Sequence, residues 1–408
     1  MEPTDEFEET ERLTLEPAPP SGPQTLDIRF TGSGSEYFRI WIVNLLLTLV
    51  TLTLYLPFAR ARRMAYFQNN TLVGGDPLGF HADPWKMFRG YLLVLALGLG
   101  YSAVSNFLPS LSWVALLVFA ALWPALWRAS LQFRLRNTSW RGVRLAFVGD
   151  LKSAYLAMLP FFIPALALAL LVPDMSDPEV VSEEAAQQAA ITVGLVVLGF
   201  MVLVPWLWAR IKAYQHGGYA FAQERTGFTA GAKRFYGLSI KIAGVSLLVL
   251  MGLGTLMGVL FGALVSLGMA SLGDLVNPGE GAGMLFMVGA GAVIAMVYVL
   301  WPLIVGSYMT SRFQNLLWSN TRSPRIRFTS QLRLAPLMRV NIVNWLLIAL
   351  TLGLYWPFAK VRSARIRLEA MSVQVDGNVD QWVSESLQRP AGVIGDAAGD
   401  FFGIDMGL

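Results

Sequence analysis

A stretch of 21 residues near the start of the chain recurs near its end. Residues 42–62 read IVNLLLTLVTLTLYLPFARAR, and residues 342–362 read IVNWLLIALTLGLYWPFAKVR. Aligned at a constant offset of 300 residues, the two copies are identical at 13 of 21 positions. An internal repeat restricts the architecture before any other feature does, because both copies must fit equivalent local structure.

Prolines that end apolar segments extend this pattern over the whole chain. They stand at positions 57, 124, 205, 302 and 357, and aromatic residues follow the first three of them by nine positions, at Tyr66, Phe133 and Tyr214. We predict one integral membrane domain, residues 26–388, built from about five degenerate units that start near residues 26, 72, 140, 225 and 323. Each unit contains a short alternating piece, an apolar segment and a basic, aromatic stretch.

The short alternating pieces predict β-strands. They are residues 26–30, 71–80, 140–147, 226–228 and 325–328. Alternation with a period of two residues, bounded by Gly, Ser and Asp, is typical of strands. Because such short strands are not stable alone, we expect them to form one small cytoplasmic sheet of about five strands.

The composition identifies a membrane protein. Hydrophobic residues make up 55% of the chain, charged residues 14%, and the mean hydropathy is +0.52, whereas an ordinary soluble domain has roughly 25% charged residues. Apolar runs long enough for spans of about 20 residues cover 91–127 (split at 106–112), 154–173, 189–209, 242–273 and 281–311. The predicted fold class is therefore mainly α: a polytopic helical bundle of six full transmembrane helices.

Charge predicts the orientation of the spans. The loops between paired spans lack Lys and Arg, whereas the loops between units are basic, which places the basic loops on the cytoplasmic side. Residues 1–25 are acidic and rich in proline, and we expect a disordered tail there, with no signal peptide. Residues 389–408 are expected to be a flexible tail, either solvated or a docking peptide for a membrane partner.

The repeated stretch itself is difficult to orient as a single crossing, because basic residues flank both sides of each copy. Its centre contains Thr51 in the first copy and Gly353 in the second, within only about 18 apolar residues. We favour two short or re-entrant helical segments that enter and leave on the same side. Eight simple crossings are the alternative.

Three pieces of the chain resemble the YjgN family, bacterial inner-membrane proteins grouped as a domain of unknown function. They are FTGSGSEYFRIWIVN at residues 30–44, LYLPFARARRMAYFQNNT at 54–71 and LTLGLYWPFAKVR at 350–362. One departure is Thr53, where the family pattern usually has Gly. The resemblance implies a location in the bacterial inner membrane, and it implies no reaction, ligand or catalytic residue.

Asn44 and Asn344 are the polar residues inside the repeated stretch that most need an explanation. A side-chain amide in hydrocarbon costs about 1 to 3 kcal/mol unless it is hydrogen-bonded. The two asparagines either bond backbone groups freed at the turn or line a polar path.

Two further groups of residues are candidates for packing or lipid contact. Gly254, Gly258 and Gly262 form a small-residue face that allows close helix packing, either inside the bundle or in a dimer. The basic, aromatic stretches suit the headgroup layer, either as general anchors or as specific lipid sites. The residues expected at that interface are Arg60, Arg62, Arg63, Arg362 and Arg365.

Residues that could support catalysis or metal binding are sparse. There is no cysteine, the apolar runs contain no ionisable residue, and His81 and His216 stand apart from other ligand types. We therefore expect no enzyme activity, no cofactor, no metal and no nucleic-acid partner. The predicted function is a non-catalytic scaffold that binds membrane lipids, another membrane protein or a second copy of the chain; a channel or carrier for a neutral or amphiphilic solute is the alternative.

Overall fold

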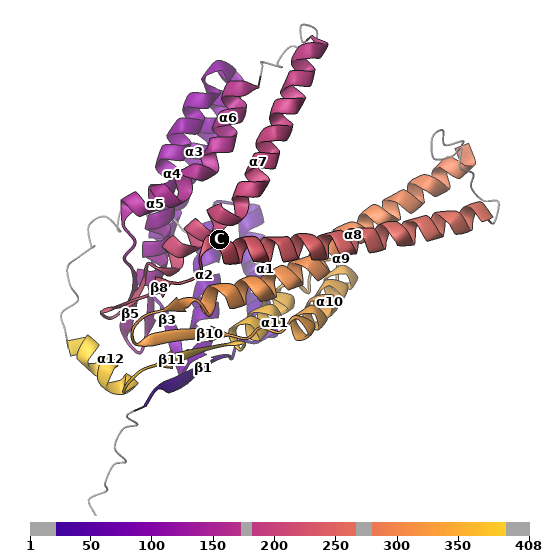
Figure 1. Cartoon of the computed structure of the whole chain (residues 1–408). Helices are drawn as coiled ribbons and strands as arrows, with labels where there is room; N and C mark the ends of the chain where they lie inside the picture. Colours follow the sequence, from indigo (N-terminus) through magenta and orange to yellow (C-terminus); the bar gives the residue numbers. More distant parts are fainter. Residues whose placement is uncertain (1–21, 173–181, 267–279, 389–408) are drawn as a thin grey trace, which may run out of the picture.

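A computed structural model describes residues 22–172, 182–266 and 280–388 of the 408-residue chain. It has two parts, a continuous sheet and a set of helices that extend away from it (Figure 1). Both ends of the described chain lie at the sheet, because β1 (Gln24–Phe30) pairs antiparallel with β11 (Met371–Val375).

The sheet has eleven strands in the described part of the chain, in the order β7-β6-β5-β4-β3-β2-β1-β11-β10-β9-β8. The edge strands β7 (Glu224–Arg225) and β8 (Gly227–Phe228) are separated in sequence by Thr226 alone, so the sheet curls round until its two edges are adjacent. The remaining strands are β2 (Thr71–Val73), β3 (Asp76–Phe80), β4 (Thr138–Trp140), β5 (Val143–Phe147), β6 (Tyr219–Phe221), β9 (Thr321–Arg322) and β10 (Ile326–Ser330). The prediction of a small sheet of about five strands was wrong.

Tight turns inside the alternating pieces explain this error. In the first hairpin Gly74 and Gly75 have φ of +61° and +95°, and in the second Arg141 and Gly142 have φ of +49° and +81°. Positive φ at both central residues is the requirement of a two-residue hairpin turn. The piece 71–80, predicted as one strand, is therefore two strands, and the piece 140–147 begins at the last residue of β4 and continues through the turn into β5.

The inward face of the closed sheet forms the largest hydrophobic core. Ile28, Trp140, Ile326 and Val375 pack there. The amphipathic helix α12 (Val379–Gln388) covers this core, and Trp382 makes an edge-on contact with Phe221 at 5.1 Å between ring centroids.

Helices connect each strand hairpin to the next hairpin along the chain. They are α1 (Gly34–Val50), α2 (Leu56–Asn69), α3 (Pro84–Phe107), α4 (Ser112–Arg136), α5 (Leu151–Met158), α6 (Ile163–Leu171), α7 (Glu183–His216), α8 (Ala232–Ser266), α9 (Glu280–Trp318), α10 (Leu334–Leu350) and α11 (Trp356–Leu368), with short 3₁₀ turns at Pro109–Leu111 and Leu159–Phe162. The chain thus runs strand, helices, strand five times over, and α11 packs against α1. The sequence repeat stays a prediction.

The expectation of six full transmembrane helices was also wrong. Within the described residues, five helical stretches are long and apolar enough to cross a membrane: Pro84–Phe107, Pro109–Arg136, Leu151–Leu171, Glu183–His216 and Ala232–Val259. The sixth expected span, 281–311, belongs to α9, where many side chains lie outside the described part. The number of spans predicted from the sequence rested only on the lengths of the apolar runs. The length of a run does not determine the direction in which its helix points.

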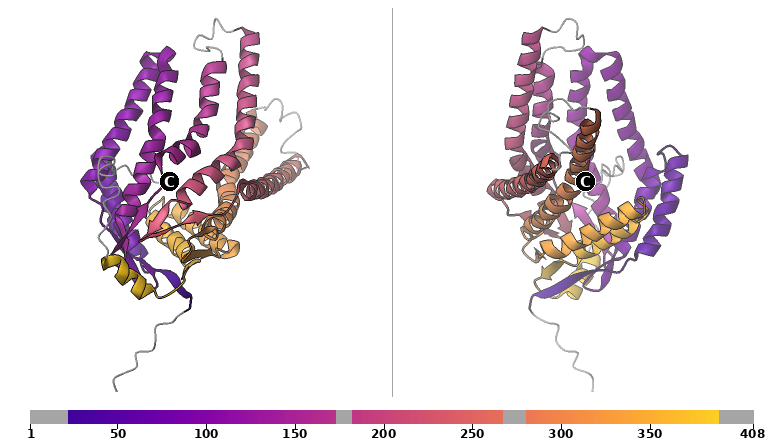
Figure 2. Two further views of the ribbon diagram at one scale, coloured as in Figure 1. Left: turned by 60° about the vertical axis from the view of Figure 1, so that its left-hand side comes forward. Right: turned by 90° about the vertical axis from the view of Figure 1, so that its right-hand side faces the viewer.

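The directions of the helices differ markedly. In Figure 1, α3, α4, α6 and α7 extend towards the top of the view, whereas α8 and α9 project to the right. The views in Figure 2 show the same divergence.

The predicted domain boundaries meet the structure only at the first strand. The strand β1 begins at Gln24, two residues inside the tail predicted for 1–25. The rest of that tail, the acidic loop at 173–181 and the tail at 389–408 lie outside the described residues.

Candidate functional site

The two copies of the repeated stretch form two helical hairpins. In the terminal hairpins, defined as α1–α2 and α10–α11, the chain leaves the sheet, turns at residues 51–55 or 351–355, and returns. A helix of 17 residues spans about 25 Å, which is less than the roughly 30 Å of a hydrocarbon core. Each copy thus forms an out-and-back helical hairpin whose apolar helix is shorter than a hydrocarbon core, and its entry into a membrane from one side stays a prediction.

Threonine side chains close both turns in the same way. The Thr51 hydroxyl donates to the Leu47 carbonyl at 2.7 Å and accepts the Tyr55 backbone N–H at 3.0 Å. The equivalent bonds of Thr351 are 2.6 and 2.9 Å long. Each hydroxyl therefore satisfies a backbone donor between two helices, where a membrane would supply no water.

The backbone at the turns adopts conformations that side chains usually avoid. Leu52 and Leu352 both have φ of +49°, and the next residue has φ of +76° at Thr53 and +93° at Gly353. Gly353 thus occupies a position that favours glycine, whereas a β-branched residue takes it in the first copy. The Thr53 hydroxyl lies 3.1 Å from the Tyr91 hydroxyl on α3.

Asn44 and Asn344 are buried inside the hairpins, 7% and 4% exposed. Their amide nitrogens donate to the carbonyls of Ala59 and Ala359, each at 3.4 Å, and the Asn344 nitrogen also lies 3.2 Å from the Ser363 hydroxyl. These partners belong to the returning helix rather than to the turn. Neither side-chain oxygen has a hydrogen-bond partner in the described part of the chain.

The tips of both hairpins are apolar and exposed. Val50 is 81% exposed, Leu52 84% and Leu352 95%. Exposing whole aliphatic side chains to water forgoes about 1.5 to 3 kcal/mol each. The tips are therefore suited to a hydrocarbon environment.

Aromatic packing joins the two hairpins to each other. The rings of Phe38 on α1 and Phe358 on α11 lie 5.7 Å apart. Gly34 faces the same Phe358 ring so closely that a β-carbon there would collide with it. The Arg365 guanidinium donates to the Gly32 carbonyl at 2.9 Å, which fixes the base of α11 to the start of α1.

Positive charge is concentrated on these two hairpins and the strands before them. Residues 26–70 and 326–370 together carry twelve Lys and Arg but only three Asp and Glu, whereas the whole chain carries 31 and 27. Arg62 and Arg63 are exposed on α2, and Arg362 donates to the Tyr355 hydroxyl at 3.1 Å. Arg60 also has an interaction partner.

Lys360 is the basic residue that the sequence-based list of interface residues missed. It is exposed, yet partial desolvation lowers the pKa of its ammonium, and the nearby charges of Arg63 and Arg367 lower it further. The ammonium also lies 4.8 Å from the centroid of the Trp356 ring. Lys360 is equivalent to Arg60 in the repeat, and that correspondence was the signal that could have identified it.

The glycine face predicted on α8 is open. Gly254, Gly258 and Gly262 are exposed, and nothing within 4 Å would meet a β-carbon at any of them. Thus no other described residue packs closely against this glycine face.

The two histidines bond hydroxyl groups. His81 Nε2 lies 2.8 Å from the Ser139 hydroxyl, and His216 Nδ1 lies 2.8 Å from the Thr321 hydroxyl. Among the described residues no group of three or more His, Cys, Asp or Glu could hold a metal ion.

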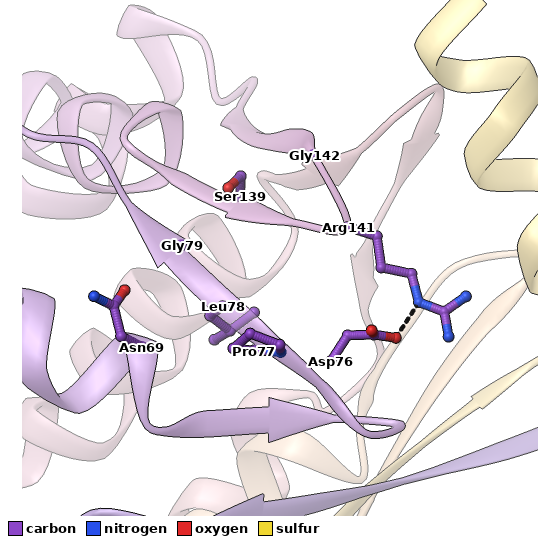
Figure 3. Close-up of a pocket in the computed structure, with 8 residues that line it drawn as sticks. All are labelled: Asn69, Asp76, Pro77, Leu78, Gly79, Ser139, Arg141 and Gly142. Atoms are coloured by element: carbon purple, nitrogen blue, oxygen red, sulfur yellow. Dashed lines mark hydrogen bonds and ion pairs between the residues drawn. The ribbon is translucent and has the colours of Figure 1, made fainter.

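A separate hollow of about 350 Å³ lies on the sheet beside the β2–β3 and β4–β5 turns (Figure 3). Arg141, whose backbone has positive φ, pairs there with Asp76 at 2.5 Å and also with Asp380 of α12. One guanidinium therefore fastens α12 to the sheet, and its charge is already neutralised by two carboxylates.

Comparison with known proteins places the whole chain in one family. Residues 25–401 match the family model described as "Bacterial protein of unknown function (DUF898)". The chain belongs to this family. It is 26% identical over 375 residues to the inner membrane protein YjgN of Salmonella typhimurium, which covers 88% of this chain and 91% of that protein.

Shorter matches fall on the YjgN proteins of two Escherichia coli strains. The protein of O157:H7 is 31% identical over 144 residues, and that of K12 is 30% identical over 138 residues, each covering 34% of both chains. No solved structure matches the chain. The resemblance drawn from residues 30–44, 54–71 and 350–362 is thereby confirmed, and this member of the family is a membrane protein with several apolar helices.

Proposed function

We propose that this chain is a multi-pass protein of the bacterial inner membrane that acts as a non-catalytic, lipid-binding scaffold. One observation carries the proposal: the terminal hairpins combine exposed apolar tips with a base in which Lys and Arg far outnumber Asp and Glu. Inserted into one leaflet, the tips reach the acyl chains while the cations remain at the phosphates. The cytoplasmic leaflet fits best, because basic flanks are retained on that side.

Magnitudes support a lipid role for this arrangement. A basic residue near an anionic membrane surface contributes about 1 kcal/mol, and several such residues point outward from α2 and α11. Exposed apolar tips contribute further when they are transferred to hydrocarbon. Both contributions favour a position of the hairpins at the membrane interface.

The architecture supports a scaffold role. Five strand–helices–strand segments follow one another around the closed sheet, and the first and last are joined through β1 and β11. We interpret these segments as the degenerate units of the repeat. In this interpretation the sheet holds the inner helices at fixed positions, and a second membrane protein or another copy of the chain can dock on them.

Lipid binding can be tested with a charge-neutralised variant. Arg62, Arg63, Lys360 and Arg362 are replaced together by Gln, and bound phosphatidylglycerol and phosphatidylcholine are counted by native mass spectrometry. Affinity for phosphatidylglycerol should fall by about fivefold for each charge lost, and phosphatidylcholine binding should not change.

A matched control removes the same number of charges from the sheet. The four substitutions are Arg144, Arg322, Arg325 and Arg327 to Gln, all at exposed positions on strands or their turns. The control should bind phosphatidylglycerol as the natural chain does. An equal loss in both variants would show that net charge alone matters and would overturn the proposal.

A second function is favoured by one observation. The unpartnered side-chain oxygens of Asn44 and Asn344 are the polar groups expected along a path for a neutral or amphiphilic solute. Such a channel or carrier would lose uptake into proteoliposomes when both residues are changed to Leu. If the Leu variants retain uptake, the asparagines line no such path, and this second function is overturned.

A further inference from the structure

Three basic residues of the two terminal hairpins flank the core cluster that joins these hairpins. We call Arg63 of α2 with Lys360 and Arg367 of α11 the cationic seam. Tyr37 of α1 packs in one core cluster with Phe67 of α2 and Val361 of α11, so the basic residues of these two helices flank the same cluster although they lie about 300 positions apart in the sequence. Arg63 lies near enough to Lys360 and to the Tyr37 hydroxyl to shift the pKa of each.

The charge of the cationic seam is not neutralised within the described part of the chain. The ion pairs found there involve Arg141, Arg325 and Arg327. Arg367 donates to the neutral Gln314 side chain at 3.0 Å. Three like charges therefore repel one another across the junction of two hairpins.

The nearby acidic groups have other partners. One oxygen of the Glu36 carboxylate accepts from the Tyr66 hydroxyl at 3.3 Å, and Glu369 accepts from the Phe30 backbone N–H at 3.4 Å. Neither carboxylate forms a salt bridge with the cationic seam. The anion that fits here must come from outside the described residues.

The surroundings of the cationic seam match a membrane interface. Trp356, which is 43% exposed, places its ring beneath the Lys360 ammonium, and tryptophan is typical of the boundary between headgroups and acyl chains. Exposed leucines follow towards the tips, including Leu352 and Leu354 on α10–α11 and Leu52 on α1–α2. A ligand with phosphates at the seam could thus lay acyl chains along both hairpins.

We propose that the cationic seam binds the headgroup of a phospholipid with two phosphates, of the diphosphatidylglycerol type. This inference rests on the lipid-binding function proposed above and names the lipid class. One phosphodiester would neutralise one of three charges and leave a repelling pair, whereas two would leave a single charge. Basic pockets between membrane helices bind such headgroups for the same reason.

The test compares lipids at equal phosphate concentration. The purified full-length chain in zwitterionic nanodiscs is titrated with diphosphatidylglycerol or with phosphatidylglycerol, and binding is read by native mass spectrometry. The natural chain should prefer the first lipid by about fivefold or more per phosphate, because a second neutralised charge strengthens binding. This preference is the quantity that the variants must change.

Two variants localise the effect. Arg63→Ser places at this position the residue found at its equivalent, Ser363, and Lys360→Gln removes the central charge. Each should reduce the preference for diphosphatidylglycerol by about fivefold and leave phosphatidylglycerol binding much less affected. Arg39→Gln, at an exposed position of α1 outside the seam, is the charge-matched control and should keep the preference.

The outcomes separate the two proposals. Equal affinity per phosphate for both lipids in the natural chain would overturn the inference and leave the lipid-binding function standing. Absence of binding to either anionic lipid would overturn both. Lys360→Arg keeps the charge, so retained preference in that variant alongside loss in Lys360→Gln would exclude a folding defect as the cause; loss in both would overturn the role of charge at the seam.

Discussion

The two terminal hairpins have the same backbone and different surfaces. Both place threonine at the turn, leucine at φ of +49° and a buried asparagine against the returning helix. Other equivalent positions differ: exposed Arg63 corresponds to Ser363, and Phe67, which packs against Phe30 and Tyr37, corresponds to Arg367. The repeated residues therefore account for the shared backbone of the hairpins, while the residues that diverged give the two hairpins different surfaces.

The repeated threonines should account for the largest effect. Changing Thr351 to Val keeps the shape but removes the hydroxyl that accepts the Tyr355 N–H and donates to the Leu347 carbonyl. A buried backbone donor left without a partner costs about 1 to 3 kcal/mol. The melting temperature in detergent should fall, and Thr51→Val should cause a comparable loss. Similar stability of Thr351→Val and the natural chain would show that water reaches the turn.

How far the sequence predicts this fold depends on the range of the interaction. The hairpins follow from local information, because basic residues flank both ends of a short apolar stretch and prolines 57 and 357 lie in the first turn of the returning helices. The closed sheet does not, because three-residue strands such as β2 and β4 are too short to show a period. Their partners are set by contacts between distant segments, as in the pairing of β1 with β11.

The candidate site shows the same division. The basic, aromatic stretches predicted Arg60, Arg62, Arg63, Arg362 and Arg365 as interface residues, but they could not show which basic residues lie near one another. Lys360 and Arg367 come near Arg63 because α2 and α11 both pack around Tyr37 of α1. The hydrogen-bond partners of Asn44 and Asn344 could not be predicted either. They are backbone carbonyls of the returning helix, and the amino-acid composition gives no information about such contacts.

Thr53 and Gly353, the equivalent residues that follow the leucines with positive φ, can each be replaced by the other. Gly353→Thr forces a β-branched side chain into positive φ without any steric contact, and it should cost about 1 kcal/mol after the gain from a less flexible unfolded chain. Thr53→Gly should stabilise by less than this, because it also loses the contact with the Tyr91 hydroxyl. Melting temperatures of the two single variants check the asymmetry. Destabilisation by both substitutions would show that Thr53 is held by its contacts rather than tolerated in spite of strain.

The smallest effect should come from Lys360, whose equivalent in the first copy is Arg60. The folded-state pKa of Lys360 lies below its ordinary value, so the unfolded chain binds more protons at this residue around that pKa. Stability rises with pH wherever the unfolded state binds more protons. The contribution of Lys360 is therefore destabilising below its folded pKa and is relieved as the pH rises through it. In lipid-free detergent the difference in melting temperature between Lys360→Gln and the natural chain should shrink as the solution becomes alkaline. A difference that does not change with pH would place Arg63 and Arg367 too far from Lys360 to form one site.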